Sequence, residues 1–244
     1  MNLDKDHFSY LKQSYELVGG KIFQKNDFDL ADLQSSISLF ENNKNTPNNP
    51  VPIDVDVYAV LSGISFNDHF MKYISSIQKK ILEAIDGKKS YFVKPFNLGV
   101  EYAVLKWPSD ILHENTLDDA KKIINETEYT SFFLKIFGIQ VHEDGCIVLK
   151  CIDEDRLIFK LRELLQVNVS NIPIKQSGWA HIPLGRILCP IGKDRMMHLK
   201  DVISKIDSEL DYNLLIDSVH LVHETKWYME QKKYLLTKKF HKRT

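Results

Sequence analysis

The sequence has little of what marks secreted, membrane-spanning or metal-binding proteins. Only three of its 244 residues are cysteines, Cys146, Cys151 and Cys189, and no two of them form a CxxC pair. This odd number without paired spacing excludes a disulfide scaffold and predicts small buried thiols in a reducing compartment. No run approaches the roughly 20 apolar residues of a membrane span, and residues 1–19 lack a signal-peptide core. We therefore expect a soluble, cytoplasmic chain without membrane contact.

Strong charge of one sign and the common ligand-binding fingerprints are also missing. The formal net charge is −1, so no dominant surface for DNA or for a membrane is predicted. Walker-type loops, GxGxxG, HExxH, EF-hand and GxSxG patterns do not occur. Among the nine histidines, His220 and His223 stand three apart on a predicted strand and therefore face opposite sides. These absences predict no metal site and no cofactor.

The composition is that of a globular protein, with 43% hydrophobic and 27% charged residues. An Asn- and Pro-rich run at 42–50 divides the chain, because such a run can hold neither a helix nor a ladder of strands. We predict a helical appendage and linker at 1–46 and one main domain at 47–244. The appendage is expected to pack on the main domain or to cover a groove.

Beyond the linker, apolar periodicities predict the order β-α-β-β-α-β-β-α-β-α-β-β. A hairpin is expected between 132–141 and 146–151, and strands at 214–222 and 234–240 close the chain. Helices are few and several strands are adjacent in sequence, which favours mainly antiparallel sheets with helices packed outside. The predicted fold class is therefore α+β, in two similar halves.

The strongest local signal is the stretch Gly178 to Ile187, which reads GWAHIPLGRI. A lone histidine in an apolar strand is commonly a buried structural residue. Here His181 follows a turn-like segment at 175–178 and precedes Arg186 by five residues. This context favours a functional site.

This stretch resembles the second motif of the 2H phosphoesterases, the superfamily of 2′-5′ RNA ligase-like proteins and 2′,3′-cyclic nucleotide phosphodiesterases. Members carry two motifs, one per lobe, of the form His, apolar, Thr or Ser, apolar. The opening strand, the helix bearing Gln78 and the closing strands are similar to those of the family, over about residues 53–239. The resemblance implies a two-lobed fold with a central groove between the motif strands.

The chain departs from the family pattern at most of the motif positions. The first motif falls on the strand after Pro95, where Gly99 stands at the family's histidine and Glu101 at its hydroxyl residue. Pro183 replaces the hydroxyl of the second motif, so His181 alone remains of four expected side chains. Because the chemistry needs both a base and an acid, losing one of the pair commonly lowers the rate by ~10²–10⁴-fold.

The resemblance implies a divergent phosphodiesterase that acts on an RNA end or a small cyclic nucleotide. In this hypothesis His181 is the acid/base group, and Glu101 is the only titratable substitute in the first motif, although a phosphate would repel it. Positive charge for the phosphate is expected from Arg186, Lys106 and Lys175. The aromatic residues expected to stack a base are Trp107 and Trp179.

Two other functions stay open. The same groove can belong to a catalytically inactive module that binds a nucleotide, RNA or another phosphorylated ligand. Alternatively, the chain is a protein-interaction domain whose groove the appendage blocks. The sequence predicts neither the substrate nor the oligomeric state.

Overall fold

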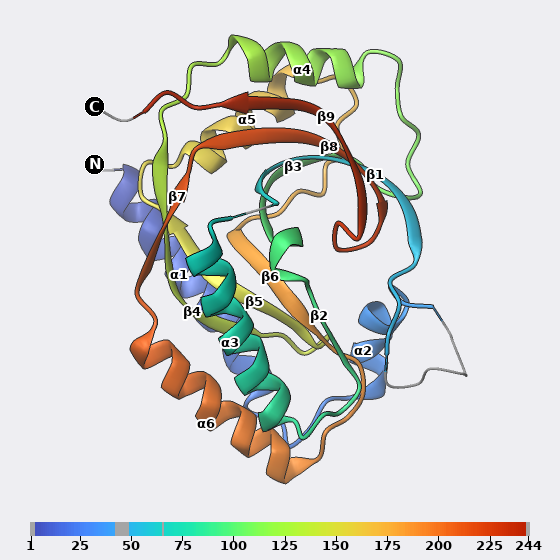
Figure 1. Cartoon of the computed structure of the whole chain (residues 1–244), viewed down its shortest axis with the longest axis vertical. Coiled ribbons are helices and arrows are strands. Elements are labelled where there is room, and N and C mark those ends of the chain that lie inside the picture. The colour runs from blue at the N-terminus through green and yellow to red at the C-terminus, as the bar shows by residue number, and fades with distance from the viewer. Residues whose placement is uncertain (1–2, 42–48, 65, 243–244) are drawn as a thin grey trace.

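A computed structural model describes residues 3–41, 49–64 and 66–242 of the chain. It consists of two antiparallel sheets with helices packed on their outer faces, as Figure 1 shows. The α+β class predicted from the order of elements is thereby confirmed. Most of the Asn- and Pro-rich run, residues 42–48, lies outside the described residues.

The helices are α1 (Leu3–Ile22), α2 (Leu30–Ile37), α3 (Asp68–Ala84), α4 (Thr116–Glu126), α5 (Leu157–Asn168) and α6 (Lys193–Glu209). The strands are β1 (Asp54–Gly63), β2 (Ser90–Phe92), β3 (Gly99–Lys106), β4 (Phe132–Val141), β5 (Cys146–Asp153), β6 (Ala180–Ile187), β7 (Tyr212–Ile216), β8 (Ser218–Lys226) and β9 (Gln231–Lys239). A short 3-10 helix, η1 (Pro95–Asn97), connects β2 to β3.

The first sheet has the strand order β3-β1-β8-β9 and curls into a half-barrel. Alternate side chains of β1 point to opposite faces of this sheet. Val60 belongs to the main core, whereas Val57, Ala59 and Leu61 form a smaller apolar cluster. Helix α5 packs on β3, and α4 packs on β8 and β9. The outer face is therefore covered, and the smaller cluster lies on the concave one.

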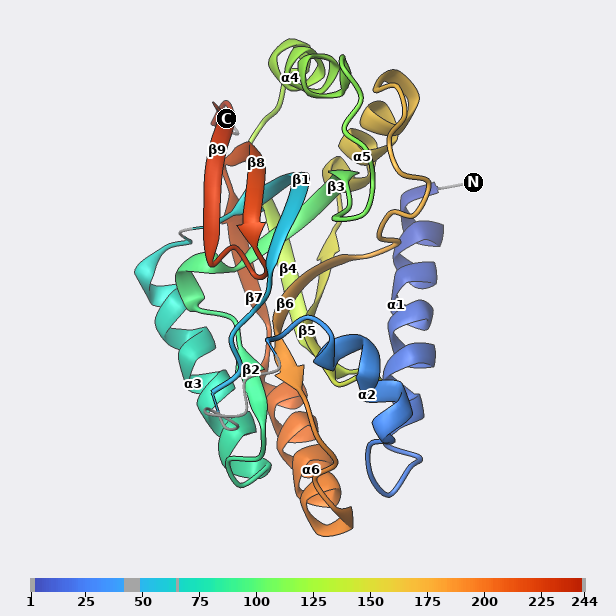
Figure 2. The same cartoon turned by 90° about the vertical axis from the view of Figure 1, so that its right-hand side faces the viewer.

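The second sheet has the order β2-β6-β5-β4-β7 and contains the predicted hairpin of β4 and β5. The hairpin turns at Gly145, whose φ is +82° and where an added Cβ would lie 2.1 Å from the carbonyl oxygen of Ile187. Only glycine fits such a position without strain. Figure 2 shows α1 on one side of this sheet and α3 on the other. The sheet is thus buried between helices.

The last third of the chain differs from its prediction. Residues 214–222 were expected to form one strand, but they contribute to β7 in the second sheet and to β8 in the first. The chain crosses between the sheets at Asp217, whose carbonyl accepts a hydrogen bond of 2.8 Å from the Phe240 N–H. Both halves carry the alternating pattern of a strand, so periodicity alone could not show the crossing.

The N-terminal helices contribute to the same core as the sheets. Leu11, Ile22 and Leu33 are buried in the main cluster of apolar residues. The Tyr15 hydroxyl lies 3.2 Å from the carbonyl oxygen of Ala180, to which it donates a hydrogen bond. The boundary between an appendage at 1–46 and a domain at 47–244 stays a prediction.

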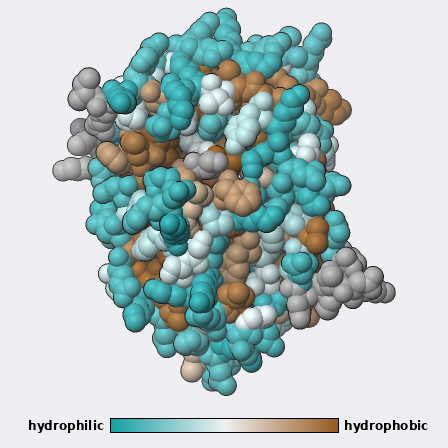
Figure 3. Space-filling model, in the orientation of Figure 1, coloured by the Kyte–Doolittle hydropathy of each residue, from teal (hydrophilic) through white to brown (hydrophobic). Residues whose placement is uncertain are grey.

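Hydrophilic residues cover most of the face drawn in Figure 3, with apolar patches between them. Within the part of the chain that the structure describes, no helix combines the length and the apolar character needed to cross a membrane.

One buried side chain, that of Arg162 on α5, joins the two sheets. Its Nε donates to the Tyr102 carbonyl at 2.6 Å, and one terminal nitrogen donates to the carbonyls of Glu101 at 3.0 Å and Trp179 at 3.1 Å. Tyr102 and Glu101 lie on β3, whereas Trp179 immediately precedes β6. The guanidinium therefore fixes the two motif strands relative to each other.

We predict that Arg162→Ala lowers the free energy of unfolding by at least about 3 kcal/mol, because it leaves several buried carbonyls without a donor. Chemical denaturation measures this loss. Arg195→Ala is the matched control, since the ion pair of Arg195 with Asp86 lies at the surface, and at most about 1 kcal/mol is expected there. Equal losses in the two variants would contradict the bridging role of Arg162.

Candidate functional site

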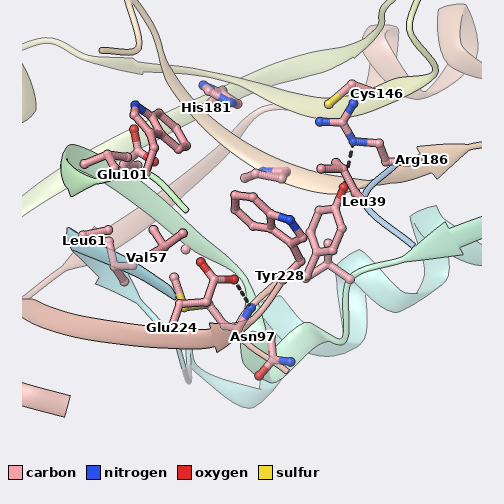
Figure 4. A pocket seen from close by; sticks show the side chains of 18 of the residues that line it. Leu39, Val57, Leu61, Asn97, Glu101, Cys146, His181, Arg186, Glu224 and Tyr228 are labelled. Carbon is pink, nitrogen blue, oxygen red and sulfur yellow. Dashed lines mark hydrogen bonds between the residues drawn. The ribbon is translucent and has the colours of Figure 1, made fainter. Parts of the chain in front are cut away.

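A cavity of about 470 Å³ opens between the two sheets. Residues of both motif strands line it, Gly99 and Glu101 from β3 and His181 and Pro183 from β6. Figure 4 shows His181 and Glu101 toward one end of the cavity and Arg186 and Tyr228 toward the other. The expected groove between the motif strands is therefore present, although one motif histidine is missing.

His181 lies partly buried in the cavity wall. No described residue forms a hydrogen bond with its ring, and its Nδ1 is fully buried. Burial, together with the smaller effects of the nearby charges of His142, Arg162 and Arg186, lowers the pKa of His181 to about 4. At neutral pH the imidazole is therefore uncharged and free to accept a proton.

Glu101 also reaches the cavity without a partner for its carboxyl group among the described residues. Burial raises the pKa of Glu101 to about 7, against a smaller opposing effect of the Arg162 guanidinium. That guanidinium is held by backbone carbonyls, including the one of Glu101 itself. A neutral imidazole and a carboxyl that titrates near neutrality thus share one end of the cavity.

A second carboxyl, that of Glu224 on β8, lines the same cavity and is 4% exposed. Its Oε1 accepts a hydrogen bond of 2.8 Å from the Met229 N–H, which holds the turn between β8 and β9. Burial raises the pKa of Glu224 to about 7, partly opposed by the hydrogen bond from Met229. The role of this residue is thus explained by the turn that it supports.

Arg186 lines the cavity as expected, but its guanidinium is already engaged. One terminal nitrogen lies 2.8 Å from Asp144 Oδ2 and 2.6 Å from Ser36 Oγ, and Nε donates to the Tyr228 hydroxyl at 2.7 Å. Ser36 belongs to α2, and its hydroxyl also donates to the Asp144 carbonyl. Helix α2 therefore closes this end of the cavity and fixes Arg186 there.

Lys175 and Trp107 line the cavity from the loops that flank it. The Trp107 indole N–H donates to the Lys175 carbonyl at 3.3 Å, which joins the two loops. Gln176, which the sequence did not single out, extends the free edge of β3. Its side chain bonds the Val104 N–H at 2.9 Å and the Val104 carbonyl at 2.8 Å. A partly buried loop glutamine beside a strand edge has no sequence signal of its own.

Two of the residues expected to bind substrate do not line the cavity. The Lys106 Nζ forms an ion pair with Asp56 at 3.0 Å and donates to backbone carbonyls. The Trp179 indole donates to Ser14 Oγ at 2.8 Å and packs against the Tyr15 ring under α1. Both side chains serve contacts that hold the fold together, so the structure does not bring them to the site.

Apolar side chains form the rest of the cavity wall. The smaller cluster on the concave face of the first sheet supplies Val57, Ala59, Leu61 and Val104, and Trp227 and Met229 from the β8–β9 turn pack against it. No pattern in the sequence marked Trp227 of this turn as a cavity residue. A mainly apolar cavity with a few convergent polar groups is typical of small-molecule sites.

The residues that the structure describes contain no group of three or more His, Cys, Asp or Glu side chains that could hold a metal ion. His220 bonds Thr237 at 2.9 Å, whereas His223 lies 2.7 Å from Asp56. The two histidines of β8 thus have separate partners.

Comparison with known proteins gives relatives by structure but not by sequence. The chain matches no family model and no curated protein. The conserved protein of unknown function ATU0111 from Agrobacterium tumefaciens superposes with a TM-score of 0.60 at 11% identity, over 82% of this chain and 90% of that chain. TT0787 of Thermus thermophilus gives 0.56 at 12% identity, over 77% of this chain and 100% of that one. E. coli LigT in its apo form superposes with a TM-score of 0.51 at 12% identity, over 78% of this chain and 99% of that chain. At such identities the likeness shows a shared fold.

We predict that Glu101→Gln stabilises the folded chain at high pH. The unfolded chain ionises this carboxyl near 4.5 and the folded chain near 7, so stability falls as the pH rises from 4.5 to 7. At about 1.4 kcal/mol per pKa unit, the uncharged amide should raise the free energy of unfolding by about 3–4 kcal/mol at pH 8. At pH 4 the substitution should change the free energy of unfolding little.

Denaturant titrations at pH 4 and pH 8 measure this difference. Glu126→Gln, at an exposed position of α4, is the control and should show no comparable difference between the two pH values. A Glu101→Gln variant no more stable than wild type at pH 8 would mean that the carboxyl is well solvated there.

Proposed function

We propose that this chain, which has the two-lobed fold of the 2H phosphoesterases, is a divergent phosphodiesterase for a small cyclic nucleotide or an RNA end. The observation that supports it is that both motif strands line one cavity, with His181 and Glu101 at the same end. His181 is the acid/base group of this proposal.

The surroundings of the two groups suit a division of roles between base and acid. Titratable groups whose pKa values are pushed apart commonly serve as base and acid of one reaction. The uncharged His181 takes a proton from the water or 2′-hydroxyl that attacks phosphorus. As the bond from phosphorus to the leaving oxygen breaks, that oxygen takes a proton from the protonated Glu101. Each group ends the step with the opposite protonation, and exchange with solvent restores both.

The remaining cavity residues suit a nucleotide. The volume of the cavity, about 470 Å³, lies in the range of roughly 300–1,000 Å³ typical of small-molecule pockets. Trp107 offers a ring for a base, and such stacking contributes about 1–3 kcal/mol per base. Lys175 supplies a positive charge at the cavity. In this proposal Arg186 shapes the opposite end, because Asp144 already neutralises it.

A second candidate function is favoured by the residues at the other motif positions. Gly99 has no side chain to act as a second acid/base group, and Pro183 has no hydroxyl to hold a phosphate oxygen. In addition, a histidine whose pKa is about 4 is a weak base. The alternative is therefore an inactive module that binds the same class of ligand in the same cavity.

We predict that His181→Ala lowers the turnover of 2′,3′-cyclic AMP by at least about a hundredfold, the low end for loss of a general acid or base. The melting temperature should not fall, because no described residue loses a hydrogen-bond partner when this ring is removed. Steady-state kinetics and thermal denaturation on the same preparation measure both quantities.

His220→Ala is the matched control, since this histidine also lies on a strand but bonds Thr237 and does not line the cavity. It should lose stability and keep turnover per folded molecule. If wild type shows no turnover but binds 2′,3′-cyclic AMP, and His181→Ala weakens that binding, the inactive module is the function. Unchanged activity together with unchanged stability in His181→Ala would rule out every role proposed here for this histidine.

A further inference from the structure

The Glu101 carboxyl is a polar group whose presence the fold does not explain. No described residue donates a hydrogen bond to it, although it stands in a wall that is otherwise mainly apolar. Glu224, the other glutamate of the cavity, holds a turn through the Met229 N–H. A carboxyl left without a partner at one end of a cavity is therefore available to a ligand.

The charged groups around Glu101 come from each element packed against it. From α5, Arg162 approaches; its Nε and one terminal nitrogen donate to backbone carbonyls, and its other terminal nitrogen is buried without a partner among the described residues. From β1, the register partner is the apolar Leu61. Other charged or titratable groups that face the cavity are Glu224 on β8, His181 and Arg186 on β6, Lys175 in the loop before β6, and Asp144, which is paired with Arg186. None of these groups forms an ion pair with Glu101.

An anionic ligand cannot approach an ionised Glu101 without strong repulsion, because the wall around it excludes much of the screening water. The same carboxyl in its protonated form carries an O–H that can donate to an oxygen of the ligand. A phosphate in this end of the cavity therefore selects the protonated form.

We propose that Glu101 binds the ligand as a neutral acid, its O–H donating a hydrogen bond to a phosphate oxygen, so that binding of a phosphodiester requires a proton on this residue. The inference rests on the proposed function of the cavity and adds how the ligand is recognised. It holds for a catalytic and for an inactive site alike, because it concerns binding and not bond cleavage.

The protonation equilibrium gives the expected pH dependence. Burial raises the pKa of Glu101 to about 7, so the binding-competent form is almost complete at pH 5.5 and a few per cent at pH 8.5. Because apparent affinity scales with the competent fraction, the dissociation constant should rise about thirtyfold over this interval. A phosphodiester keeps a single negative charge throughout, so the ligand itself adds no titration.

The experiment is a titration of the full chain with 2′,3′-cyclic AMP between pH 5.5 and 8.5. Tryptophan fluorescence, read immediately after rapid mixing, reports binding before turnover, since Trp107 lines the cavity. Glu101→Gln replaces the acid by an amide that donates at every pH, and its affinity should stay nearly constant. Any slope left in this variant belongs to Glu224, the other cavity carboxyl whose pKa burial raises to about 7. Glu224→Gln, which keeps an acceptor for the Met229 N–H, should retain most of the wild-type slope.

Adenosine, which lacks the phosphate, is the ligand control and should bind with little pH dependence. Wild-type affinity that is independent of pH, or a Glu101→Gln variant with the wild-type slope, would overturn the inference and leave the proposed function standing. Affinity that increases with pH would also overturn it, because the ionised carboxylate would then be the binding form. Absence of binding by folded wild type at every pH would contradict the proposed function and this inference with it.

Discussion

The structure depends on one buried guanidinium that lies between two sheets. Arg162 donates to carbonyls of β3 and to the residue that precedes β6, so each motif strand has its position set by the same side chain. A lysine in its place would present a point charge and fewer donors in a less fixed geometry. Because Glu101 and His181 lie next to these anchored carbonyls, the bridge also places the two titratable groups at one end of one cavity. It does so without an ion pair to Glu101, since Nε and one terminal nitrogen bond backbone oxygens, whereas the other terminal nitrogen is buried without a partner among the described residues.

This arrangement lowers the stability of the folded chain at some pH values. A carboxyl with a raised pKa and a histidine with a lowered pKa both disfavour their charged forms, so the folded chain is less stable at pH values where the unfolded chain ionises them. An apolar pair of similar size would avoid that cost. Residues that violate the rule of paired buried charges mark functional sites more often than structural ones. The geometry of the cavity, which holds both groups on separate sheets, favours the functional explanation.

Much of the fold was predictable because its signals are local. The hairpin of β4 and β5 follows from alternation interrupted by Asp144-Gly145, and the strand of His181 follows from its apolar flanks. The crossing at Asp217 was missed, since the residues on both sides alternate alike while they join different sheets. Lys106 was expected at the cavity, but its Nζ pairs with Asp56 of the neighbouring strand β1 instead. Arg162 has no sequence signal, because its partners are carbonyls far away in the chain.

The positions of the positive charges explain why a phosphate in this cavity would be bound partly by groups other than arginine and lysine. The two cations that flank the motif strands are used within the fold, Arg186 by Asp144 and Lys106 by Asp56. Helix α2 strengthens the first of these pairs by adding the Ser36 hydroxyl, so the N-terminal segment is part of the wall that fixes Arg186. With those charges neutralised, an anion in the cavity meets Lys175, the neutral imidazole and the carboxyls of Glu101 and Glu224. Only a carboxyl changes from repelling the anion to binding it within the neutral pH range, and Glu224 is already bonded to the Met229 N–H, which makes the proton of Glu101 the decisive variable of the site.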